Sequence, residues 1–110
     1  MQPSILPTEP LSEVVFIHDY LQLVFQDACF SIYNAAEIRH GNDSVSQGQP
    51  GFCDGLVSLI GQPLTATSTS PSLSLTFRSG VVLVVEQSGQ GPEAWQFNRF
   101  SGQIVVEQNA

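Results

Sequence analysis

The stretch Leu21-Gln-Leu-Val-Phe25-Gln-Asp-Ala-Cys-Phe30-Ser-Ile32 is followed 52 positions later by Leu73-Ser-Leu-Thr-Phe77-Arg-Ser-Gly-Val-Val82-Leu-Val84. Both copies read L-x-L-x-F, then four residues of turn, then two apolar residues separated by one. This alternation is typical of a β-hairpin with one buried face. The repeat therefore predicts two similar hairpins, and it carries no signal of chemistry.

Runs of β-branched and aromatic residues, separated by turn residues, place further strands around the two hairpins. The expected strands cover residues 12–18, 21–26, 29–34, 63–69, 73–78, 81–87, 93–98 and 103–107. Residues 54–61 predict one short helix, with Asp54 as its N-cap and Gly61 as its left-handed end. We therefore expect a mainly β fold, at the border with α+β, of about eight antiparallel strands. Two similar meander halves would form a sandwich or an open barrel with the helix at its side.

The length of 110 residues corresponds to a single domain, 1–110. Residues 1–11 form a proline-rich N-terminal lead without the basic and apolar regions of a secretory signal, so a cytoplasmic protein is expected. Residues 39–51 are polar and predict a mobile loop. Two cysteines do not make a disulfide framework, and we expect both thiols to be reduced and packed.

The charge balance excludes several classes of partner. The chain has ten carboxylates, three arginines and no lysine, for a net charge of −7. Nucleic-acid binding is not expected, because no basic cluster could release counterions from phosphates. Membrane association is not expected either, since anionic lipid would repel the acidic surface and no apolar run reaches about 20 residues.

No motif indicates catalysis, a cofactor or a metal. His18, Asp19 and His40 could suggest an acid/base or metal site, but they lack the spacing that preorganises ligands. The serines lack a nucleophile-elbow motif, and no histidine neighbours either cysteine in sequence. We therefore expect no catalytic, cofactor-binding or metal-binding residues. The alternative is a small-molecule binder or enzyme with a pocket between sheet and helix, near His18, Asp19 and Tyr20.

Association with another protein is the function that the composition favours. A domain this small, with 42% hydrophobic residues and no lysine to guard its strand edges, leaves apolar surface uncovered. Residues 81–85 are apolar throughout, which predicts a strand covered on both sides or in contact with another subunit. We expect a homodimer, and the acidic surface could also attract a basic protein partner. The candidate interface or ligand patch comprises Val81, Leu83, Val85, Trp95 and Phe97, although Trp95 and Phe97 could instead close the core.

Three motifs resemble those of small bacterial β-rich domains. They are the two hairpins, at 21–34 and 73–80, and the step Gly91-Pro-Glu-Ala94. Some domains of this kind occur as immunity proteins beside toxins. The resemblance implies a small, acidic, non-catalytic binding protein, and it transfers no catalytic residue to this chain.

Overall fold

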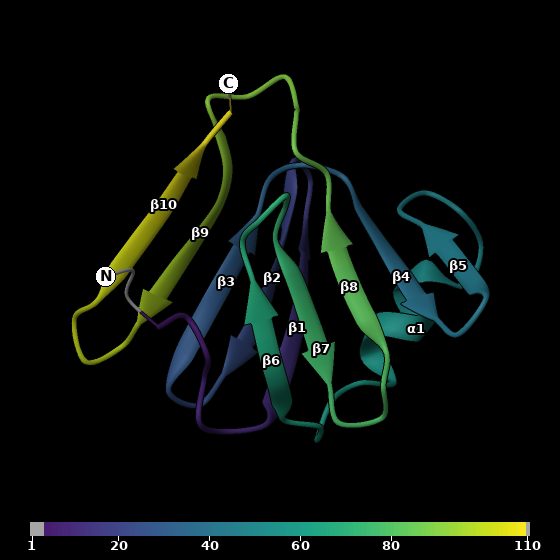
Figure 1. Cartoon of the computed structure of the whole chain (residues 1–110), viewed down its shortest axis with the longest axis horizontal. Coiled ribbons are helices and arrows are strands. Elements are labelled where there is room, and N and C mark those ends of the chain that lie inside the picture. The colour runs from purple at the N-terminus through teal and green to yellow at the C-terminus, as the bar shows by residue number, and fades with distance from the viewer. Residues whose placement is uncertain (1–3, 110) are drawn as a thin grey trace.

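Two antiparallel sheets of five strands pack against one another in the computed structural model, which describes residues 4–109 (Figure 1). Sheet A has the order β1 (Leu11–Ile17), β2 (Tyr20–Phe25), β3 (Ala28–Ile32), β9 (Glu93–Arg99) and β10 (Ile104–Gln108). Sheet B has the order β5 (Asp43–Ser46), β4 (Ala36–His40), β8 (Val82–Val85), β7 (Ser74–Phe77) and β6 (Leu64–Ser68). The predicted mainly β fold with one short helix is confirmed, and the sheets form a sandwich that does not close into a barrel.

Strands β4 and β5 account for the difference between the ten strands of the structure and the predicted eight. The sequence predicts residues 39–51 as a mobile loop. In the structure this segment contains the end of β4, all of β5 and the connection from β5 to the helix. Gly41, at a φ of 62°, makes the turn, and Ile38 pairs with Val45 to give the hairpin its apolar contacts with the core. The sequence does not indicate this hairpin because its apolar residues are only Ala36, Ile38 and Val45, which is too little alternation to mark two half-buried strands.

Helix α1 (Phe52–Val57) connects β5, at one edge of sheet B, to β6 at the opposite edge. It begins two residues before the predicted start, with Gly51 in a left-handed conformation at the N-cap, so Asp54 lies in the first turn and does not cap the helix. Gly61 adopts the predicted left-handed conformation, at a φ of 97°, after a short run of turns. Phe52 and Leu56 bury the helix against the sandwich, which holds a segment too short to be stable alone.

The two halves of the chain have the same topology and interlock. Each half contributes a three-strand meander, β1–β2–β3 or β6–β7–β8, and then a hairpin, β4–β5 or β9–β10. Each hairpin crosses to the other sheet, so that β4 pairs with β8 and β9 pairs with β3 (Figure 1). Neither sheet is therefore built from one half alone.

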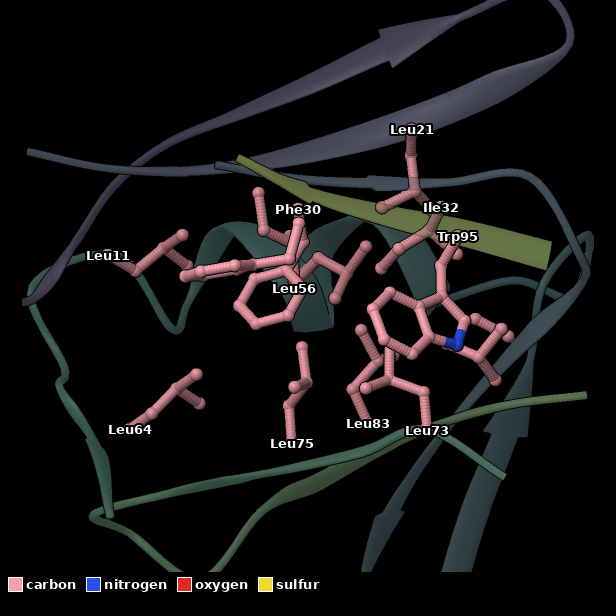
Figure 2. Close-up of a cluster of buried hydrophobic side chains, with 14 of the residues drawn as sticks. Leu11, Leu21, Phe30, Ile32, Leu56, Leu64, Leu73, Leu75, Leu83 and Trp95 are labelled. Carbon is pink, nitrogen blue, oxygen red and sulfur yellow. The ribbon is translucent and has the colours of Figure 1, made fainter. Parts of the chain in front are cut away.

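The core lies between the sheets, and the repeated motif supplies a large part of it. Phe30 is fully buried and packs against Phe25 and Phe97, with ring centroids 6.1 and 4.9 Å away. Figure 2 shows Trp95 and leucines from both sheets pointing into the same space. All six residues of the two L-x-L-x-F motifs are at most 1% exposed: Leu21, Leu23, Phe25, Leu73, Leu75 and Phe77.

The second hairpin differs from the first in register. Leu23 pairs with Phe30, seven positions later, whereas Leu75 pairs with Leu83, eight positions later. The extra residue lies in the turn, where Gly80 has a φ of 93° and Phe77 donates its backbone N–H to Val81 over 2.8 Å. Because successive side chains of a strand point to opposite faces, one added residue reverses the faces of β8.

Asp27 lies in the turn between β2 and β3 and fixes the N-terminal segment to this turn and to the end of β9. One oxygen of this carboxylate, Oδ2, accepts hydrogen bonds from the backbone and hydroxyl of Thr8 at 2.8 and 2.9 Å, and the other accepts from Glu9 N at 3.3 Å. Arg99 lies 3.3 Å from Oδ2 and also donates to the Leu6 carbonyl at 3.1 Å. Residues 1–3 of the predicted proline-rich lead lie outside the described residues.

The Asp27 network should make the free energy of unfolding depend on pH in the acid range. Burial alone would raise the pKa of Asp27, but the hydrogen bonds from Thr8 and Glu9 outweigh it and hold the pKa below its usual value. A carboxyl whose pKa is lower in the folded state stabilises the fold above its unfolded pKa of about 3.9 and loses that contribution as the pH falls through the folded value. We expect Asp27→Asn to cost about 1–2 kcal/mol at pH 7 and to flatten the loss of stability between about pH 5 and 2.

Urea denaturation at a series of pH values measures this effect. Asp43→Asn, at an exposed position outside the network, is the matched control and should keep the wild-type pH profile. An Asp27→Asn profile parallel to that of the wild type would show that the hydrogen bonds of Asp27 do not favour its charged form.

Candidate functional site

The predicted interface patch is mostly core. Leu83, Val85 and Phe97 are fully buried and Trp95 is 3% exposed, while Val81 is half-buried against the core. The four buried side chains therefore cannot line an exposed patch on this sandwich. The one-residue shift in the β7–β8 turn points Leu83 and Val85 inward, and Trp95 and Phe97 close the core, which is the alternative that the sequence left open.

The outward side chains of β8 are instead Val82 and Val84, both half-buried. They line a depression of about 340 Å³ on the outer face of sheet B, together with Arg39 and Pro71. The strand is therefore apolar on both faces, as predicted, but among residues 4–109 no second layer covers its outer face.

The structure does not assemble a site from His18, Asp19 and His40. His18 and Asp19 lie in the β1–β2 turn with side chains 96% and 86% exposed, and His18 Nε2 is 3.5 Å from Asp19 Oδ1. His40 is exposed at the end of β4, in the other sheet. Within residues 4–109 no three His, Cys, Asp or Glu side chains are grouped so as to hold a metal ion.

Tyr20, in contrast, belongs to an aromatic pair on the outer face of sheet A. Its ring lies 5.2 Å from that of Tyr33, at an interplanar angle of 47°. Tyr33 lies between two depressions: one of about 400 Å³ next to Asp19 and Glu93, and one of about 410 Å³ over the middle of the sheet. Neither depression includes a residue of α1. Asp19 and Tyr20 therefore do not lie at a pocket between sheet and helix, as the alternative prediction required.

The depression over the middle of sheet A, which we call the sheet A depression, collects the outward side chains of three adjacent strands. Alternation directs these side chains outward, because their neighbours Leu21, Leu23 and Phe30 point into the core. Gln22 donates a hydrogen bond from Nε2 to Ser31 Oγ over 3.1 Å. The main lining residues are Tyr20 and Gln22 from β2, Ser31 and Tyr33 from β3 and its end, and Gln96 and Asn98 from β9.

The thiol in this depression is unsuited to nucleophilic chemistry. Cys29 is half-buried, and burial, countered in part by a hydrogen bond with Ser31, raises the pKa of its thiol. The reactive thiolate is therefore disfavoured at neutral pH. Cys53 lies exposed on α1, and the two thiols are not joined in a disulfide, so only Cys29 is packed as the sequence predicts.

The second surface feature is the edge of sheet A formed by β10. Ile104 and Val106 are 59% and 38% exposed, and neighbouring Phe100 is 56% exposed. The Gln103 carbonyl accepts a 2.7 Å hydrogen bond from Arg99, and in an antiparallel ladder the bonded residues alternate. The backbone groups of Ile104 and Val106 therefore point away from β9.

We call Ile104 and Val106, with their backbone groups, the β10 edge. Sequence reasoning placed the interface on other strands. A usable signal was present in residues 103–107, a final strand with three β-branched residues and neither lysine nor proline to block pairing.

Comparison with known proteins gives no family. No known protein family matches the chain, and neither a curated protein nor a solved structure matches it significantly.

Within residues 4–109, no helix is long and apolar enough to cross a membrane.

Proposed function

We propose that this protein is a non-enzymatic domain that acts through protein association, with the β10 edge as its contact surface. The observation that supports the proposal is the edge strand β10 of sheet A, which carries exposed Ile104 and Val106 side chains and whose outward backbone groups have no partner strand within residues 4–109. An exposed edge of this kind is a template for another strand, and natural sheets usually guard it with lysine, proline or a covering loop.

A second copy of the same chain is the partner that we propose. Two β10 strands can pair antiparallel about a two-fold axis, so that the same residues serve both subunits. Such pairing would join the two A sheets into one continuous sheet. Each copy carries a net charge of −7, so repulsion opposes pairing at low salt, and added salt screens it.

Replacing Val106 with lysine should weaken this association strongly. The substitution removes a β-branched contact and places two like charges close to the two-fold axis, one from each copy. We expect the dissociation constant to rise by about 100-fold, which corresponds to about 2.7 kcal/mol. Size-exclusion chromatography with light scattering, over a range of concentrations and at low and high salt, measures the constant.

Val57→Lys is the matched control, because Val57 is a similarly exposed valine on α1, away from sheet A. It should leave the dimer intact. A wild-type protein that stays monomeric up to about 1 mM at high salt would overturn the homodimer. If the protein instead forms a complex with a basic protein, and salt weakens that complex, then the partner is the basic protein favoured by the acidic surface and not a second copy.

Small-ligand binding is the second candidate function. The observation that favours it is the pair of depressions that meet at Tyr33, of about 400 and 410 Å³. Both volumes fall within the range of about 300–1,000 Å³ that is usual for small-molecule clefts. Asp19 and Tyr20 of the predicted alternative site each line one of these depressions.

A further inference from the structure

We infer that the sheet A depression binds a neutral polyhydroxylated ligand, that is, an uncharged oligosaccharide. The side chains that line it offer hydrogen bonds without charge: the amides of Gln22, Gln96 and Asn98 and the hydroxyl of Ser31. An amide side chain both donates and accepts, and a hydroxyl does the same. This set matches the alternating donors and acceptors of a sugar.

Aromatic rings stand beside these polar groups. Tyr20 and Tyr33 form a tilted pair at one end of the depression, and the half-exposed ring of Phe100 also lines it. A tyrosine combines an apolar ring face with a polar hydroxyl, so it suits a ligand whose own faces are apolar and whose rim is polar.

The absence of charge from this lining separates ligand classes. The chain has ten carboxylates, yet the lining of the sheet A depression, within the described residues, includes neither a carboxylate nor an arginine. An anionic ligand would lose water here without gaining an opposite charge, which is costly, and the nearby carboxylates of Glu13 and Glu93 would repel it. A neutral ligand has no such cost, provided that its hydroxyls find partners.

The corresponding place on sheet B shows that the sandwich does not require this lining. There the depression over β7, β8 and β4 has neither an amide nor an aromatic side chain in its lining, which consists of Val82, Val84, Pro71, a charged Arg39 and the serines Ser70, Ser72 and Ser74. The two sheets have the same topology, so their outer faces differ in side chains and not in backbone plan. The amides and tyrosines of sheet A are therefore a property of its surface and are not needed to form the fold.

The ligand and the proposed dimer do not compete for the same groups. Pairing at the β10 edge uses backbone groups in the plane of the sheet, whereas the sheet A depression lies on its face. Ile104 and Val106 are paired with Asn98 and Gln96 and so point to that face, but they do not line the depression. The inference does not rest on the dimer, and either one can fail alone.

NMR titration of the full chain tests the inference. The probes are cellohexaose, maltohexaose, xylohexaose and mannohexaose, with hexagalacturonate as an anionic counterpart. We expect at least one neutral probe to shift the side-chain amide signals of Gln22, Gln96 and Asn98, and the anionic probe to shift none. Asn98→Ala should weaken that binding by about tenfold, the usual effect of losing one or two hydrogen bonds.

Thr76→Ala is the matched control, because Thr76 is a half-buried polar residue on the outer face of sheet B. It should bind the probe as the wild type does. Absence of any shift with all four neutral probes would overturn the inference, as would binding of hexagalacturonate alone. Equal weakening by Thr76→Ala and Asn98→Ala would place the ligand elsewhere and overturn it as well.

Discussion

Leu83→Ala should lower the free energy of unfolding by about 2–5 kcal/mol, whereas Val82→Ala, one residue away, should lower it by less than about 1 kcal/mol. Leu83 is fully buried opposite Leu75, and its loss would leave a cavity between the sheets. Val82 is half-buried on the outer face of sheet B, where water can fill the space. The difference between the two variants follows from the register of the β7–β8 hairpin.

Urea denaturation of both variants at pH 7 gives the two free energies, with equal m-values as the check that both unfold from the same native state. The sequence repeat alone gives the opposite order, because it aligns Val82 with the buried Phe30. A larger loss for Val82→Ala than for Leu83→Ala would mean that the second hairpin has the register of the first.

This hairpin shows what sequence could and could not predict of the fold. Alternation identified both L-x-L-x-F strands and a mainly β fold, because burial of one face imposes a period of two, but it left a sandwich and an open barrel as alternatives. The register of β8 was not accessible, since residues 81–85, which include the strand, are all apolar and either face could be buried. The choice is made in the turn, where Gly80 accommodates an additional residue in a left-handed conformation.

The exchange of hairpins between the halves lies further from what the sequence can show. Strand β3 pairs with β9 and β4 pairs with β8, and no residue pattern marks partners that are so distant along the chain. The similarity between the halves predicted two meanders correctly. It did not indicate that each half would complete the sheet of the other.

The prediction of site residues was limited in the same way, by unknown strand register and unknown long-range strand pairing. Val81, Leu83 and Val85 were assigned to a surface because the register of their strand was unknown, and the structure buries Leu83 and Val85 completely. Tyr20 lines a depression on the outer face of sheet A and not the predicted pocket between sheet and helix. The grouping of Tyr20 with Gln96, however, depends on the long-range pairing of β3 with β9, so only the structure could bring the two together.

The two crossovers between the sheets are joined by Asn34, a polar residue that is only 5% exposed. Its amide nitrogen donates to the Glu86 carbonyl at 2.9 Å and to Asn109 Oδ1 at 2.8 Å, and Asn109 returns a 3.0 Å hydrogen bond to Asn34 Oδ1. Glu86 stands 52 positions after Asn34, at the equivalent point of the second half. The side chain thus links the two halves where their chains change sheets.

Gly89→Ala should disrupt this contact and lower the free energy of unfolding by about 2–4 kcal/mol. A β-carbon at position 89 would collide with Asn34 Oδ1 and lie 2.7 Å from Asn34 Cγ. Asn34 cannot turn away without breaking its hydrogen bonds to Glu86 and Asn109, which would leave polar groups unpaired at a buried position. Gly91→Ala, in the same connection but with open space around its β-carbon, is the matched control and should change stability by less than about 0.5 kcal/mol.

A double-mutant cycle separates this collision from a general effect on the connection. Asn34→Ala alone loses its hydrogen bonds, but it also removes the atoms that an alanine at position 89 would meet. The double variant Asn34→Ala/Gly89→Ala should therefore be more stable than the sum of the single losses predicts, by at least about 1 kcal/mol. Additive losses would mean that Gly89 is needed for its own backbone conformation and that Asn34 is not the group it accommodates.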